Sequence, residues 1–96
     1  MKLYAIADEC DRLLAETTHD CKPIKFGTFV PGTDGNYYDH IIVFAYKSKH
    51  GYVPGAEEFI EYLKKIVGKD PKLIEPEFAF DLENLRVIEF VTQEPE

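Results

Sequence analysis

The chain has no tryptophan, one methionine and only two cysteines among its 96 residues. Cys10 and Cys21 are too few for the disulfide framework of a small secreted domain, and their spacing matches no compact redox or zinc motif. No apolar run approaches the roughly 20 residues of a membrane span. These shortages argue against a disulfide-stapled or membrane-spanning protein. We expect two unbridged thiols and a cytoplasmic location.

Residues that could carry catalysis or bind metal are also few. Adjacent strand residues point to opposite faces of a sheet, so Asp39 and His40 cannot orient one another as a catalytic pair. No two of the soft metal ligands have the close spacing of a zinc site. The soft ligands are Cys10, His19, Cys21, His40 and His50. We therefore expect no catalytic residue, no bound metal and no cofactor.

Acidic side chains are abundant and unevenly distributed. The chain has 18 Asp and Glu against 11 Lys and Arg, a net charge of -7. Residues 70–96 contain eight of the carboxylates but only Lys72 and Arg86 as cations. Binding to nucleic acid or to an anionic membrane requires basic side chains. The charge therefore excludes both as direct partners and favours a basic protein.

The length and the apolar content predict one folded domain over residues 1–96. A chain of this size can bury roughly 60–65% of its unfolded surface in a single core. Its apolar content of 45%, with seven Phe and six Tyr, is too high for intrinsic disorder.

Two segments have the apolar spacing of amphipathic helices. The first runs from Leu3 to Leu14 and ends near Thr17, which places Cys10 on the apolar side as a buried, inert thiol. The second covers residues 56–67 and follows Pro54-Gly55, with acidic residues in its first turn.

Strand patterns occupy most of the remaining chain. Short segments rich in β-formers lie at residues 24–30, 37–46, 73–80 and 85–92. Pro-Gly and Asp-Gly pairs within residues 31–36 predict a hairpin between the first two. Pro76 cannot donate a ladder hydrogen bond, so the third should be an edge strand or contain a bulge.

The predicted fold class is α+β. The order of elements is αββαββ, and two helices on one face of a four-stranded antiparallel sheet form a two-layer sandwich. This order is a circular permutation of the ferredoxin-like arrangement, although a simple meander of four strands is equally compatible.

The strand over residues 37–46 is apolar on both faces, whereas a two-layer fold covers only one face. Tyrosine is enriched at protein interfaces. Tyr37, Tyr38, His40 and Tyr46 are therefore candidate anchors for a partner. The alternative is that the second face is covered by other parts of the same chain.

The predicted hairpin near the C-terminus is a candidate acidic surface. On the first strand, Glu75 and Glu77 would point outward about 6.6–6.8 Å apart. Asp81 and Glu83 follow at the turn, and all four carboxylates could steer a basic partner. The alternative is a solvated face that only keeps the protein soluble.

The segment Lys47 to Gly51 lies between a strand and a helix start, where backbone N–H groups can hold an anion. It lacks the spacing of a phosphate-binding loop, and a solvated basic loop is the simpler interpretation.

The function these features favour is that of a small acidic binding protein without enzymatic activity. It would occlude a larger, basic, nucleic-acid-handling protein, as phage anti-CRISPR, anti-restriction and toxin-immunity proteins do, in a host cytoplasm if phage-encoded. The alternative is a homodimeric α+β protein, paired through its sheet face, that binds a small molecule or is a minor enzyme with a pocket there.

Overall fold

The structure, a computed structural model, describes residues 2–17, 24–29 and 39–91; within them, the side chains of Asp39, His40 and Glu77 are not described. Over this part of the chain the protein is an α+β fold with an antiparallel sheet and one α-helix. The strands are β1 (Lys2–Ala7), β2 (Leu13–Thr17), β3 (Lys25–Phe29), β4 (Asp39–Ile41), β5 (Val43–Phe44) and β6 (Arg86–Val91). The helix is α1 (Ala56–Lys69), followed by the short 3-10 helices η1 (Pro71–Leu73), η2 (Pro76–Phe78) and η3 (Leu82–Asn84).

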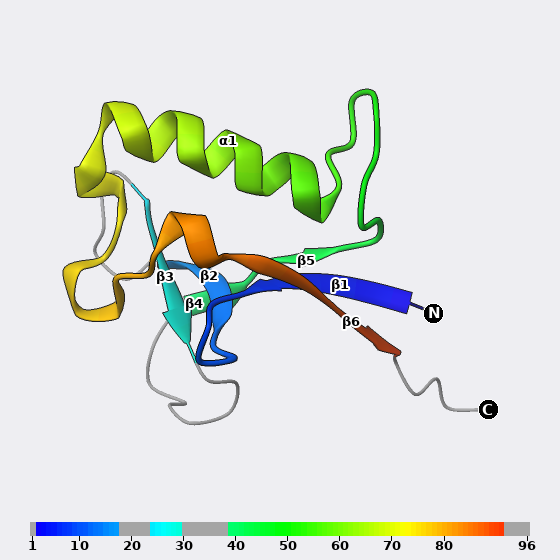
Figure 1. Cartoon of the computed structure of the whole chain (residues 1–96), viewed down its shortest axis with the longest axis horizontal. Helices are drawn as coiled ribbons and strands as arrows, with labels where there is room; N and C mark the ends of the chain where they lie inside the picture. Colours follow the sequence, from blue (N-terminus) through cyan, green and yellow to red (C-terminus); the bar gives the residue numbers. More distant parts are fainter. Residues whose placement is uncertain (1, 18–23, 30–38, 92–96) are drawn as a thin grey trace.

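The β1–β2 hairpin lies at the centre of the sheet, and its two strands separate with distance from their connecting turn. β1 and β2 pair only beside their connecting turn, at Ala7 and Leu13. Farther from the turn, β4 pairs with β2 and β5 pairs with β1. β4 and β5 are separated only by Ile42, whose N–H donates to the Leu14 carbonyl at 3.1 Å, so they act as one bent strand between β2 and β1. β3 then lies beside β2, and β6 lies along the whole of β1 (Figure 1).

α1 confirms the helix predicted over residues 56–67. Glu57 and Glu58 in its first turn and Lys69 in its last complement the helix dipole. The Asp70 N–H closes the C-terminal end by donating to the Ile66 carbonyl at 3.0 Å.

The core lies between α1 and one face of the sheet, in two layers (Figure 1). Phe59 of α1 packs against Phe26 of β3 and Phe44 of β5, with ring centroids 6.1 and 5.3 Å apart. The buried apolar side chains of this cluster are Ile6, Leu14, Phe26, Phe44, Ala56 and Leu63. Because Phe44 points into the core, the neighbouring Val43 is exposed on the other face of the sheet.

The predicted helix from Leu3 to Leu14 is wrong. These residues form β1, a tight turn and β2, and Cys10 lies exposed in that turn instead of in the core. Asp11 has a φ of 62°, which ends any helical path. The αββαββ order with two helices, and with it the permuted ferredoxin-like or meander topology, is therefore corrected to β1–β5, α1, η1–η3 and β6 for the described residues.

The predicted strand over residues 73–80 is also wrong. Pro71 and Pro76 begin η1 and η2, because a fixed φ and a missing N–H suit the first position of a helix. Only Ile74 makes a bridge, parallel to Phe26, and the Glu75 N–H donates to the Phe26 carbonyl at 2.8 Å. The expected hairpin of residues 73–92 does not form.

Three strand predictions are confirmed in part or in full. β3 and β6 fall within residues 24–30 and 85–92, while β4 and β5 cover the described centre of residues 37–46. The hairpin turn predicted at residues 31–36 lies outside the described residues.

Candidate functional site

The predicted aromatic anchors are described only in part. Tyr37 and Tyr38 lie outside the described residues, and His40 belongs to β4 with no described side chain. Tyr46 lies beyond the end of β5 and is 41% exposed. The Lys49 ammonium lies 4.1 Å from the centre of the Tyr46 ring, a distance typical of a cation–π contact.

The predicted acidic residues are not arranged along one strand. Glu75 precedes η2, and Glu77 lies within η2. Asp81 caps η3 by accepting the Glu83 N–H at 3.0 Å, and the Glu83 carboxylate lies 3.9 Å from Lys64. The structure thus brings Asp81 and Glu83 together in and beside η3, on a different element from Tyr46.

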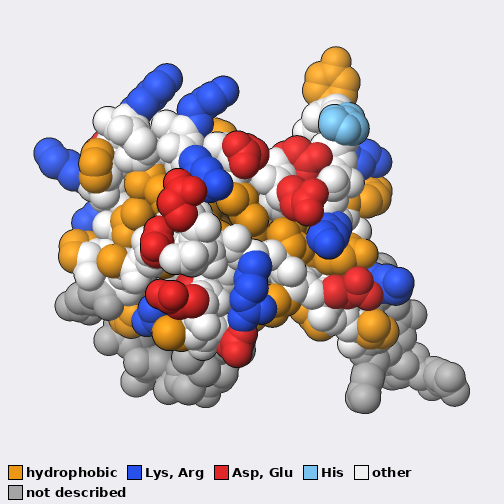
Figure 2. Space-filling view, viewed as in Figure 1, with side chains coloured by type: hydrophobic (Ala, Val, Ile, Leu, Met, Phe, Trp, Pro, Cys, Tyr) orange, Lys and Arg blue, Asp and Glu red, His pale blue; other side chains and the backbone are white. Residues whose placement is uncertain are grey.

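A loop projects beyond α1, and its residues Tyr52 and Val53 were not identified from the sequence as an interaction element. This projecting loop, residues 45–55, rises beside the N-terminal end of α1 (Figure 1). Tyr52 at its tip is fully exposed, and Val53 is 55% exposed. Figure 2 shows hydrophobic side chains at the tip and acidic side chains below it. The usable signal was the pair Tyr52-Val53 between Gly51 and Pro54, because apolar residues within a turn sequence have no strand or helix to bury them.

The base of the projecting loop caps α1. The N–H groups of Ala56 and Glu57 donate to the carbonyls of Tyr46 and Lys47 at 3.0 and 2.9 Å. These are two of the donors that a helix start leaves without an intrahelical partner. Gly55, at the N-cap, offers no side chain to do this. The loop base therefore replaces a capping side chain.

Side chains of the first helical turn bind the loop in return. Ser48 donates its hydroxyl to the Glu57 carboxylate at 3.0 Å, and the Lys49 N–H donates to the Glu58 carboxylate. With the two backbone bonds, these contacts close the loop base while leaving its tip free.

Glutamates surround an open hollow on α1 next to the loop base. The hollow has a volume of about 410 Å³ and is lined by Glu57, Glu58, Ile60 and Glu61. Lys64 lies 4.0 Å from Glu61, at the edge of helical salt-bridge range. We call this feature the acidic hollow.

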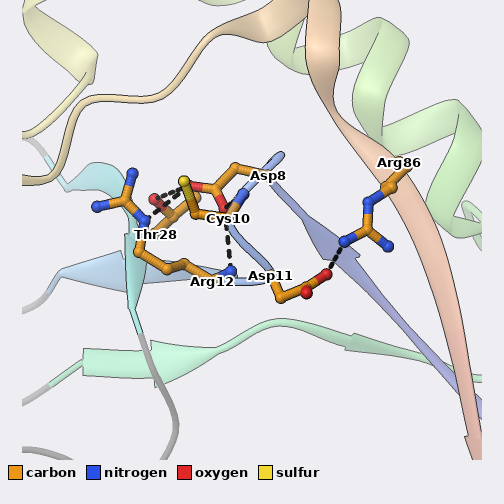
Figure 3. Close-up of polar contacts among 6 residues, drawn as sticks. All are labelled: Asp8, Cys10, Asp11, Arg12, Thr28 and Arg86. Atoms are coloured by element: carbon orange, nitrogen blue, oxygen red, sulfur yellow. Dashed lines mark hydrogen bonds and ion pairs between the residues drawn. The ribbon is translucent and has the colours of Figure 1, made fainter.

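A second polar centre lies at the β1–β2 turn (Figure 3). Asp8 is buried, and one of its oxygens accepts the N–H groups of Cys10 and Arg12 at 2.9 and 3.0 Å. The other oxygen accepts the Arg12 side chain at 2.8 Å and the Thr28 hydroxyl at 3.0 Å. Asp11 pairs with Arg86 on the far side of the turn. Through its contact with Thr28, the Asp8 carboxylate links the β1–β2 turn to β3.

Two opposing effects act on the pKa of Asp8. Burial raises it, because a charged carboxylate loses its hydration. The hydrogen bonds from Arg12, Thr28 and Cys10 favour the charged form and bring the pKa below its ordinary value. Asp8 is consequently an ionised structural group at neutral pH.

Two further hollows lie on the described part of the chain, the first beside this turn and the second near the Lys25 end of β3. The first, of about 310 Å³, is lined by Asp8, Glu9, Arg12, Ala79, Phe80, Asp81 and Asn84. The second, of about 430 Å³, is lined by Lys25, Asp70, Pro71, Lys72, Ile74 and Pro76. Among the described residues, no group of three His, Cys, Asp or Glu side chains is arranged to hold a metal ion.

Comparison of the chain with models of protein families, with curated proteins and with solved structures gives no match. None of the helices in the described ranges has the length and apolar character needed to cross a membrane.

Proposed function

We propose that the protein is a small acidic binding protein, without enzymatic activity, that occludes a surface of a larger, basic, nucleic-acid-handling protein. The acidic hollow beside the projecting loop is the observation that carries this proposal. It combines a lining of three glutamates, of which only Glu61 lies near a cation on α1, with neighbouring exposed tyrosines, which are the two properties that such an interface needs.

The balance of charge distinguishes the acidic hollow from the other two. It has three glutamates and no basic residue in its lining. In the hollow at the β1–β2 turn, Arg12 offsets part of the acidic charge, and the third hollow contains two lysines and one aspartate. Among these three hollows, the one at the start of α1 has the largest excess of acidic over basic lining residues, which supports placing a basic partner there.

This assignment moves the centre of the proposed interface from the C-terminal segment to α1. Tyr46 belongs to it directly, as an exposed side chain at the base of the projecting loop. The other predicted contacts remain proposals: Tyr37, Tyr38 and His40 as anchors, and Glu75, Glu77, Asp81 and Glu83 as steering charges. Anti-CRISPR, anti-restriction and toxin-immunity proteins are the functional classes to which such a protein would belong.

The test begins with capture of the partner from a lysate of the source organism, followed by kinetic binding measurements. Reversing the charge of the acidic hollow, with Glu57→Lys and Glu61→Lys together, should lower the association rate about tenfold at low salt. The effect should shrink at high salt, because screening shortens the range of these charges to a few ångströms.

The matched control reverses two exposed carboxylates on other elements, Glu9→Lys and Glu89→Lys, with the same change in net charge. The association rate of this control variant should stay within about threefold of the wild-type rate. Equal effects of the two double variants would reduce the proposal to a non-specific charge effect. Sedimentation that gives a stable homodimer, with no basic protein captured, would favour the small-molecule-binding alternative.

A further inference from the structure

We propose that the projecting loop is the anchor of the interface, and that it inserts the Tyr52 ring into an apolar pocket of the partner protein. The pocket would lie beside the basic surface that contacts the acidic hollow. This inference rests on the proposed function and adds the element that holds the partner once the charges have attracted it.

The exposure of the loop tip is the first argument. Tyr52 is fully exposed and Val53 is 55% exposed, and neither belongs to the core cluster. An aromatic side chain that becomes buried removes on the order of 150–250 Å² of surface from water. That gain is available only to a complex.

The tied base of the loop is the second argument. The loop makes two backbone hydrogen bonds to α1 from Tyr46 and Lys47, and two more through Ser48 and Lys49. A loop fixed at its base loses less conformational entropy on binding than a free one. The tip is thus presented at a defined position relative to α1.

Gly51 sets the direction of the tip. Its φ of 115° belongs to the region that favours glycine, and no atom lies within 4 Å of the position a Cβ would take. Glycine is required here by the backbone conformation and not by lack of space. This glycine conformation directly precedes the exposed Tyr52.

The charge around the loop favours a partner protein whose apolar pocket is bordered by basic residues. The lining of the acidic hollow contains three glutamates and no basic residue, while Lys47, Lys49 and Lys64 lie next to it and not in its lining. The whole chain carries a charge of -7, which repels anionic membranes and nucleic acid. A pocket bordered by lysine or arginine would pair with these glutamates while it encloses Tyr52.

The experiment measures dissociation from the partner captured above. Tyr52→Ala should raise the dissociation rate about 30-fold or more, as expected for a buried aromatic anchor. Tyr52→Phe keeps the ring, so its dissociation rate should stay within about threefold of the wild-type rate. Tyr62, an exposed tyrosine on α1, provides the positional control as Tyr62→Ala. The melting temperature of each variant shows whether it still folds.

A cross-linking measurement identifies the pocket independently. Replacing Tyr52 with the photoreactive p-benzoylphenylalanine should give a cross-link to apolar residues of the partner, and the same replacement at Tyr62 should give little. Cross-links at position 52 only to polar surface residues would overturn the inference.

The remaining outcomes separate the inference from the proposed function. If Glu57→Lys with Glu61→Lys weakens binding but Tyr52→Ala changes it less than about threefold, the inference fails and the proposed function stands. If no basic partner is captured, both fail. A homodimer that Tyr52→Ala dissociates, or flotation with lipid vesicles that it abolishes, would assign the loop to a second copy or to a membrane and overturn the inference.

Discussion

Asp8 is the residue on which the β1–β2 turn depends. A reversal within five residues leaves backbone N–H groups without ladder partners, and the Asp8 carboxylate accepts two of them while it also binds Arg12 and Thr28. Because it is buried, removing its charge would leave four donors poorly satisfied. The turn is therefore specified by a side chain and not only by backbone preference.

We expect Asp8→Asn to lower the free energy of unfolding at pH 7 by about 2 to 4 kcal/mol, because it breaks a buried, charged hydrogen-bond network. Urea denaturation measures the change. Asp11→Asn is the matched control, since Asp11 is exposed, lies in the same turn and has a φ of 62° that asparagine tolerates. Its effect should remain under about 1 kcal/mol.

Wild type and Asp8→Asn together also test the direction of the shift in the Asp8 pKa. A lowered pKa means that the carboxylate adds stability above the unfolded pKa of about 4, and that this stability is lost as the pH falls through the lower folded pKa. The difference between wild type and Asp8→Asn should therefore shrink below about pH 4. A difference that grows on acidification would contradict the assigned direction.

At the scale of elements, the sequence predicted those that follow a single periodicity. α1 shows apolar positions at helical spacing and an acidic first turn, and the structure has it within a few residues of the predicted range. β3 and β6 were likewise predicted from short runs of residues that favour strands. In each of these elements local preference and tertiary packing agree.

The predictions failed where packing on two sides removed the alternation of a strand. Ala5, Ile6 and Ala7 are all buried at the end of β1, as are Leu14 and Ala15 in β2, so the pattern resembled a helix stripe. The turn signal was present in Asp8 and Asp11, but the apolar spacing masked it. In residues 70–84, Pro76, which starts η2, was interpreted as the sign of an edge strand or a bulge, and Asp81, which caps η3, as part of a turn between two strands.

The proximity of the acidic hollow to the projecting loop could not be predicted, because it depends on how the loop packs against α1. The glutamates were visible as a helix start, but their position next to Tyr46 is set by the capping contacts at the loop base. Gly55 permits this close approach. A Cβ at this position would lie 2.8 Å from the Ser48 Cα and 2.9 Å from the Lys49 nitrogen.

We expect Gly55→Ala to open the loop base and to destabilise the protein by about 1 to 3 kcal/mol, because the contacted atoms are backbone and cannot rotate away. Thermal unfolding measures this change. Gly68→Ala is the control: it replaces a glycine within α1 that has open space around it, and should stabilise the protein by roughly 0.5–1 kcal/mol. Equal changes at the two positions would rule out the packing argument.

At the scale of the whole molecule, charge and size are compatible with the occlusion proposed above. A stable interface covers about 800 Å² on each partner, a small share of the 6745 Å² of accessible surface here. The projecting loop and the first turns of α1 are adjacent and can both belong to one such interface. The net charge of -7 has the same sign as the charge of a nucleic acid.

A protein that occludes a nucleic-acid site should compete with nucleic acid for its partner. We expect titration of the wild type into a partner loaded with fluorescently labelled nucleic acid to release the label, as measured by anisotropy. Glu57→Lys with Glu61→Lys should require about tenfold more protein for half-release, whereas Glu9→Lys with Glu89→Lys should require less than about threefold more.

The salt dependence of this competition decides whether the two ligands share a site. Nucleic acid loses affinity steeply as salt rises, because its binding releases many counterions. In the proposed complex, a few glutamates and the apolar contact of the exposed Tyr52 would hold the partner, so the affinity of the protein should fall less steeply. Displacement should therefore become easier at higher salt. A ternary complex in which the label stays bound at saturating protein would place the interface elsewhere on the partner and contradict occlusion.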